Sequence, residues 1–79
     1  MVEEAFVLIT CEEGHEEKII NELTKKKEIV IINRVRGPYN ILVKIKGETI
    51  DTVIGTITSE IKTNDKIKYI LTLNVKQNI

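Results

Sequence analysis

The first apolar run of the chain covers residues 4–11, EAFVLITC, in which apolar and β-branched side chains dominate. The run is too short for a helix of its own and ends at the polar segment EEG, so it predicts a β-strand. Successive side chains of a strand point to opposite faces, which places Phe6 and Leu8 on one face and Ala5, Val7 and Ile9 on the other. Both faces of a sheet built on this strand therefore need cover from water.

Two further strands are predicted on either side of a Gly-Pro break. Residues 28–36, EIVIINRVR, are rich in β-branched side chains, and Gly37 and Pro38 interrupt them. The next segment, residues 39–46, alternates Tyr39, Ile41, Val43 and Ile45 with Asn40, Lys44 and Lys46. We expect these two strands to pair as a hairpin.

Two segments have the features of helices. The first carries Glu16 and Glu17 at its start and lysines at positions 25–27, and this charge arrangement opposes a helix dipole. Its buried stripe would consist of Ile19, Ile20 and Leu23. The second segment places apolar residues at helical spacing on one face, namely Ile50, Val53, Ile54, Ile57 and Ile61. Thr49 is expected to cap this second helix.

The last predicted strand, residues 67–76, completes the order βαββαβ. Its apolar residues Ile67, Tyr69, Leu71, Leu73 and Val75 alternate with Lys68, Thr72, Asn74 and Lys76. This order predicts an α+β, ferredoxin-like fold in which two helices cover one face of a four-stranded antiparallel sheet. We expect residues 1–79 to form a single domain, because the chain is too short to divide.

The uncovered sheet face is expected to be apolar, since the first strand is apolar on both sides. An exposed patch of this kind marks an interaction site. A chain of 79 residues with one cysteine, Cys11, also has no internal disulfide to stabilise it. The sequence therefore predicts a sheet-to-sheet dimer, that is, a dimeric α+β barrel.

The composition limits the classes of partner. Hydrophobic residues make up 42% of the chain and charged residues 30%, as in a globular protein, and the formal net charge is zero. Positive and negative side chains are interleaved, so neither nucleic acid nor an anionic membrane is an expected direct partner. No apolar run is long enough to cross a membrane, and the cytoplasm is the expected location.

Few side chains are candidates for catalysis or for holding a metal. Cys11 ends an apolar strand and is interpreted as a packed thiol, while His15 and the neighbouring glutamates suit a solvated helix start. They form no recognisable catalytic set and no metal site, and no cofactor is expected. An RNA-recognition domain shares the element order but expects several stacking aromatics, whereas the first and third strands offer only Phe6 and Tyr39.

Residues 36–40, RGPYN, form the most distinctive local sequence and have two interpretations. They fit a β-turn in which Gly37 supplies an unusual backbone angle and Pro38 stiffens the corner. They equally fit a loop that presents polar groups to a ligand, because glycine lets a ligand approach the backbone closely.

Taken together, several segments resemble the ligand-binding domain of Lrp/AsnC transcription regulators. These are AFVLI near the start, Gly14-His15-Glu16-Glu17, the corner Val35-x-Gly37-x-Tyr39-Asn40, the second amphipathic helix, and Ile67 with Thr72 five residues later. The resemblance covers essentially the whole chain. It implies a ferredoxin-like domain that pairs through its sheet, assembles dimers into rings and binds an amino acid or a related small molecule between dimers.

The same resemblance implies which residues contact the effector. Gly37 would contribute backbone contacts, Tyr39 a pocket wall, and Asn40 a polar contact at a position where the family usually has aspartate. Thr72 and Leu73 match a last-strand position near the effector. The 79 residues do not include the helix-turn-helix domain of full-length members, so we expect a likeness to stand-alone members that bind effectors or associate with full-length Lrp/AsnC regulators.

Three functions follow as hypotheses. The preferred one is a non-catalytic module that senses an amino acid, forms homodimers and higher ring-like oligomers, and modulates transcription through a DNA-binding relative. The second is a purely structural oligomerisation partner without effector binding. The third is a small dimeric α+β barrel enzyme of monooxygenase-like type, for which the sequence supplies no catalytic set.

Overall fold

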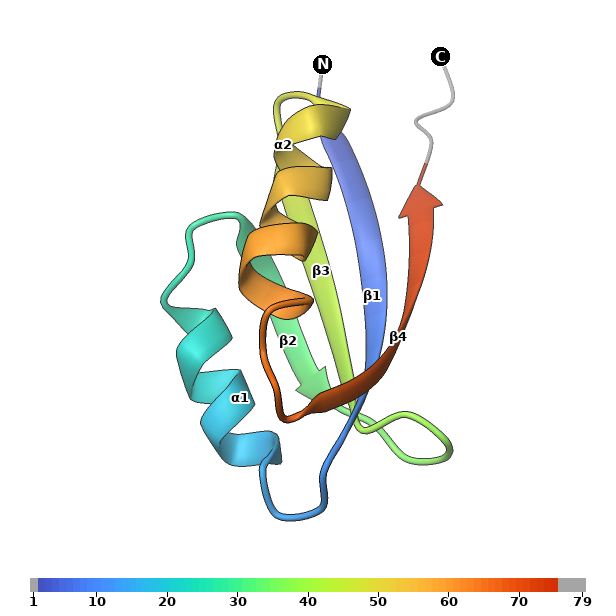
Figure 1. Cartoon of the computed structure of the whole chain (residues 1–79). Helices are drawn as coiled ribbons and strands as arrows, with labels where there is room; N and C mark the ends of the chain where they lie inside the picture. Colours follow the sequence, from blue (N-terminus) through green and yellow to red (C-terminus); the bar gives the residue numbers. More distant parts are fainter. Residues whose placement is uncertain (1, 76–79) are drawn as a thin grey trace.

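The structure, a computed structural model, describes residues 2–75 of the chain. Its elements follow the predicted order and are β1 (Glu3–Cys11), α1 (Glu16–Thr24), β2 (Ile29–Arg34), β3 (Ile41–Gly47), α2 (Ile50–Thr56), a π-helical continuation η1 (Ile57–Ile61) and β4 (Ile67–Val75). The strands form one antiparallel sheet in the order β2-β3-β1-β4, and both helices lie on the same face of it (Figure 1). The α+β, ferredoxin-like prediction is confirmed.

The core lies between the helices and one face of the sheet. The two central strands alternate strictly, with Ala5, Val7, Ile9, Ile41, Val43 and Ile45 fully buried. Ile19 and Leu23 of α1 and Val53, Ile57 and Ile61 of the second helical segment cover them. Alternation in the sequence had grouped Ile41, Val43 and Ile45 on one face, and the structure shows that this face is the one under the helices.

The boundaries of two elements differ from the prediction. The helix α1 ends at Thr24, so the lysines at 25–27 lie after its last turn. The strand β3 begins at Ile41, and Tyr39 and Asn40 belong to the loop before it. The predicted end of the last strand, Lys76, lies outside the described residues.

The second helix is rotated relative to its predicted apolar stripe. Thr49 caps it as expected, since the Thr49 hydroxyl accepts a hydrogen bond from the Thr52 backbone N–H at 3.1 Å. Ile50 and Ile54, which were predicted to be buried, are 39% and 53% exposed, and Thr56 is buried instead. The predicted stripe was wrong at these positions because α2 packs on β3 and β1, where Val53 and Thr56 point.

A register shift changes the faces of the last strand. Between Thr10 and Cys11 the pairing slips, so that Thr10 lies opposite Tyr69 but Cys11 lies opposite Ile67. The bulge leaves Ile67 packed against the core, while Tyr69 points to the uncovered face. The prediction that Ile67 shares a face with Tyr69 is therefore wrong.

Candidate effector site and association surface

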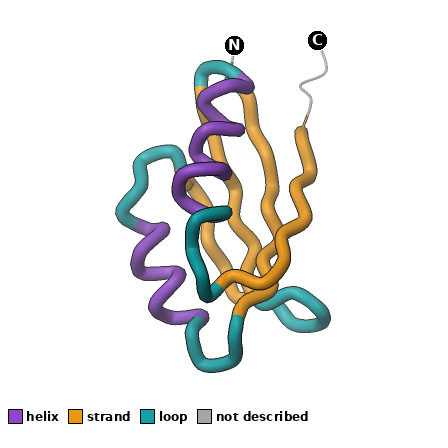
Figure 2. The backbone as a smooth tube through the Cα atoms, viewed as in Figure 1, coloured by secondary structure: helices purple, strands orange, loops and turns teal. Residues whose placement is uncertain are grey.

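Hydrogen bonds hold the loop between β2 and β3 against the end of β1. The Asn40 N–H donates to the Ile9 carbonyl at 2.8 Å, and the Val35 N–H donates to the Asn40 carbonyl at 2.9 Å. The Thr10 hydroxyl donates to the Pro38 carbonyl at 2.8 Å. The loop thus has a defined position beyond the end of the sheet, as the backbone trace shows (Figure 2).

The Asn40 side chain also forms a hydrogen bond to β1. Its Oδ1 accepts a hydrogen bond from the Cys11 backbone N–H at 2.9 Å, in a part-buried position beside the register shift. Only the oxygen of an amide can accept this bond, so the contact also fixes which way the amide points. Asn40 therefore completes the hydrogen bonding of β1 at the point where regular pairing with β3 ends.

The other end of the amide faces solvent. Within residues 2–75, no hydrogen-bond partner is found for Asn40 Nδ2, and no buried side-chain nitrogen or oxygen lacks a partner. The nitrogen is consequently accessible, with two N–H donors available to a ligand. The resemblance implied that Asn40 makes a polar contact with the effector, and of the two ends of its amide the oxygen already accepts a hydrogen bond from Cys11.

Gly37 is needed for its backbone conformation. Its φ is +111°, a region that residues with a Cβ rarely adopt. Apart from Gly37 and its two chain neighbours, no heavy atom lies within 4 Å of the position that a Cβ would occupy, so the space next to Gly37 is open. The positive φ fits the β-turn interpretation, and the open space is compatible with the close approach of a ligand that the other interpretation supposed.

Thr72 and Leu73 lie well away from the loop within one protomer. Thr72 is opposite Val7 and Leu73 is opposite Phe6, so their side chains point to different faces of the sheet. The loop contacts β1 at the level of Tyr69, which is three residues and about 10 Å along the strand from Thr72. The structure brings Gly37, Tyr39 and Asn40 into one loop but does not bring the two β4 residues to them.

The uncovered sheet face carries a continuous apolar surface. Phe6 and Leu8 of β1 lie between Leu42 of β3 and the β4 residues Tyr69, Leu71 and Leu73. Leu71 is 42% exposed and Leu73 is 48% exposed. We call this set of residues the open face. Its exposure is what a surface that associates with a partner requires.

One ion pair borders the open face and was not anticipated from the sequence. Lys44 Nζ lies 3.1 Å from a Glu4 carboxylate oxygen and 5.6 Å from the centre of the Phe6 ring. Both charged side chains are mostly buried. The alternation of polar and apolar positions had shown Lys44 only as a polar residue, because the register that sets it beside Phe6 and near Glu4 depends on strand pairing.

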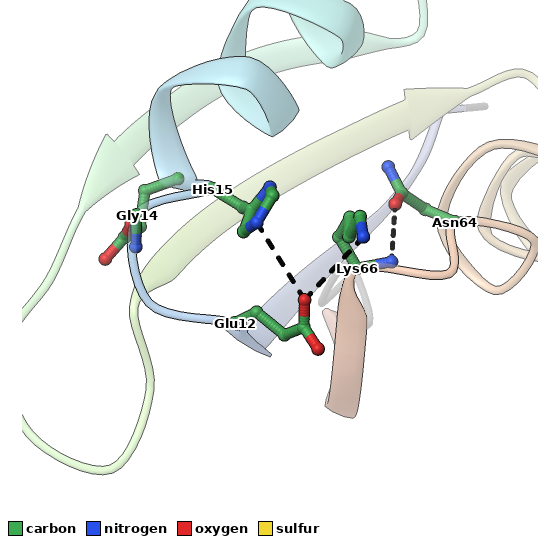
Figure 3. Close-up of polar contacts among 6 residues, drawn as sticks. Glu12, Gly14, His15, Asn64 and Lys66 are labelled. Carbon is green, nitrogen blue, oxygen red and sulfur yellow. Dashed lines mark hydrogen bonds and ion pairs between the residues drawn. The ribbon is translucent and has the colours of Figure 1, made fainter.

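Cys11 and His15 have the environments that the sequence suggested. Cys11 is 5% exposed, and burial, together with the negative charge of Glu16, raises the pKa of its thiol. His15 Nε2 lies 3.9 Å from Glu12 Oε2, which also lies 3.8 Å from Lys66 Nζ (Figure 3). These distances exceed hydrogen-bond length and the groups are partly exposed, so the cluster is a screened surface interaction.

Metal sites and membrane-spanning helices are both absent from residues 2–75. No group of three or more His, Cys, Asp or Glu side chains is placed to hold a metal ion there. Among the same residues, neither helical segment has the length and hydropathy of a membrane span.

A continuous apolar surface left open on one face of the sheet marks a site of interaction with a partner. The family model described as the Lrp/AsnC ligand binding domain matches residues 4–79. The chain therefore belongs to the Lrp/AsnC ligand-binding domain family. Membership supports a regulatory, effector-binding role.

Solved structures with this fold include regulators of the same family. The chain is 26% identical to E. coli AsnC, with a TM-score of 0.86. The match covers 98% of this chain but only 52% of AsnC. It is also 26% identical to the hypothetical protein PHS023 from Pyrococcus horikoshii, with a TM-score of 0.90 and coverage of 99% and 93% of the two chains.

A third solved structure was determined with a ligand. It is the complex of the Neisseria meningitidis transcriptional regulator NMB0573 with L-Met. This regulator is 11% identical to the chain, with a TM-score of 0.84, and the match covers 98% of this chain and 51% of the regulator. At this identity the likeness concerns the fold alone. A search of curated proteins gave no match.

Proposed function

We propose that this chain is a non-catalytic module that binds a small-molecule effector, an amino acid in the first instance, and associates through its open face. Association with DNA-binding Lrp/AsnC regulators would carry the signal to transcription. The observation on which the proposal depends is the open face itself, an apolar surface formed by three adjacent strands of a domain of an effector-binding family.

The arrangement of the predicted contact residues supports a site between subunits. Asn40 and Thr72 lie too far apart in one protomer to hold the same small ligand. If both contact the effector, they do so from different subunits. Binding that needs two subunits favours the assembled state by mass action, and this couples ligand concentration to assembly.

Amino acids are the class to test first. A regulator with the same fold was solved in complex with L-Met. In this chain the loop offers accessible backbone at Gly37 and amide donors at Asn40, which suit a small polar molecule.

The test is the mass of the native assembly, measured by analytical ultracentrifugation with and without a panel of amino acids. We expect a dimer or larger species at micromolar concentration and a change in mass or thermal stability with at least one amino acid. A 9.0 kDa monomer under all conditions would contradict association. A stable oligomer that no amino acid affects would favour the second candidate, a purely structural partner.

A further inference from the structure

The ion pair between Glu4 and Lys44 lies on the same side of the sheet as the open face. Glu4 precedes Ala5, which is fully buried under the helices, so strand alternation turns Glu4 to the opposite side together with Phe6. Lys44 is paired with Phe6 across β1 and β3, and its Nζ lies 5.6 Å from the centre of the Phe6 ring. A partner that covers this ring therefore comes into contact with the Lys44 ammonium group as well.

The two charges have limited contact with water in a single protomer. Lys44 Nζ lies 3.1 Å from a Glu4 carboxylate oxygen, and the two side chains are 24% and 17% exposed. In the other three ion pairs found among residues 2–75, every side chain is between 32% and 47% exposed. The pair on the sheet is thus the least solvated of the four, and association through the open face would remove more of its remaining contact with water.

Loss of this water has different consequences for an intact pair and for a broken one. In an intact buried pair the attraction between the charges offsets their lost hydration, so the pair contributes little net affinity. A charge that is buried without its partner has no such compensation and disfavours association strongly. The pair therefore acts on association mainly through the surfaces that it rejects.

A second copy of this chain is the partner that fits these charges. In a two-fold dimer the same surface faces itself, so each copy brings its own Glu4 carboxylate already in contact with its own Lys44 ammonium group. A partner that set a single acidic side chain here would compete for Lys44, and a basic one would compete for Glu4. Lys46, which lies opposite Glu4 near the end of β3, is exposed, and its long side chain reaches water from the edge of a covered surface.

We infer that the Glu4–Lys44 pair makes the open face selective for a second copy of this chain, because a copy adds no unpaired charge to the covered surface. The inference rests on the association proposed above and deepens it by assigning the occupant of the open face and the residues that select it. Phe6 and its apolar neighbours supply the contact area, and the ion pair decides which surfaces are allowed to cover it.

The experiment measures the dissociation constant for self-association by sedimentation. It compares the wild-type chain with Glu4→Gln, Lys44→Met and the double variant that carries both changes. Each single variant leaves one charge unpaired and should weaken self-association by about a hundredfold. The double variant has neither charge and should associate within about tenfold of the wild type. Circular dichroism establishes that each variant is folded, so that a loss of mass reports on association and not on folding.

A matched pair on the helical side of the sheet serves as the control. Lys26 Nζ lies 3.3 Å from a Glu60 carboxylate oxygen, and these side chains are 43% and 32% exposed. Lys26→Met and Glu60→Gln remove the same charges from the protein and should leave self-association unchanged.

Two further measurements address selectivity and need no single neutral variant to fold. A tagged wild-type chain should form mixed dimers with the double variant and not with Glu4→Lys, which sets two positive charges on the face. The dissociation constant of the wild type should change by less than about threefold between about 0.05 M and about 0.5 M salt, because salt screens a covered pair little.

The possible outcomes separate this inference from the proposed function. Single variants that associate like the wild type, a double variant as weak as the single ones, mixed dimers with Glu4→Lys, or strong weakening by salt would each overturn the inference while leaving association intact. A wild-type chain that stays monomeric at every concentration would overturn the proposed association as well.

Discussion

The contact between Asn40 and Cys11 makes a stability prediction that needs no ligand. In Asn40→Ala the part-buried Cys11 N–H loses its acceptor, and the neighbouring pairing of β1 is already interrupted by the register shift. Leaving a backbone donor unsatisfied costs about 1–3 kcal/mol in free energy of unfolding. For a domain of this size, each kcal/mol lowers Tm by roughly 4–8 °C.

The assay is urea unfolding followed by circular dichroism at one fixed protein concentration, because association would make stability depend on concentration. Asn40→Asp should retain most of the wild-type stability, since a carboxylate oxygen also accepts from Cys11. Asn21→Ala, on the exposed surface of α1, should be neutral or slightly stabilising. If Asn40→Ala unfolds at the wild-type urea concentration, the Cys11 contact contributes nothing, and the orientation assigned to the amide loses its support.

Three further perturbations address the open face, the loop and the buried thiol. Leu71→Asp should lower the mass of the native assembly in sedimentation experiments. Ile54→Asp replaces an apolar side chain that is similarly exposed on α2 and should leave this mass unchanged; equal effects would exclude a special role for the open face. Gly37→Ala should destabilise by about 1 kcal/mol or more because φ is +111°, while Gly55→Ala, in a helix with open space around it, should stabilise by up to about 1 kcal/mol in thermal unfolding. Cys11 should react slowly with iodoacetamide at neutral pH, and rapid alkylation of the folded protein would contradict the assigned burial. Because the pKa of Cys11 in the folded protein is raised from 9.0, the free energy of unfolding should decrease as pH rises above about 9. Cys11→Ala should lessen that decrease.

Local periodicity was sufficient to derive the element order and the groups of residues that share one face of the third strand. The alternation in residues 39–46 placed Ile41, Val43 and Ile45 on one face, and all three are fully buried. Thr49 was identified as a cap from residue type and position alone. Such features depend on neighbours within a few positions, which the sequence displays directly.

Periodicity was insufficient where packing or register decides. Helical spacing grouped Ile50 and Ile54 with Val53, but the position of α2 over β3 and β1 left both isoleucines exposed. The slip between Thr10 and Cys11 reversed the face of Ile67. A pattern shows which residues share a face, but not which neighbouring element covers it.

The candidate site shows the same division. The sequence by itself determined the fold class, the loop RGPYN with its glycine, and the resemblance from which Asn40 and Thr72 were named. Only the tertiary structure decided that the Asn40 oxygen binds Cys11, that its nitrogen faces outward, and that Thr72 lies too far away to join it in one protomer. The physical reason is that a hydrogen bond between residues 29 positions apart depends on strand pairing, which brings distant parts of the chain together without a signature in either segment.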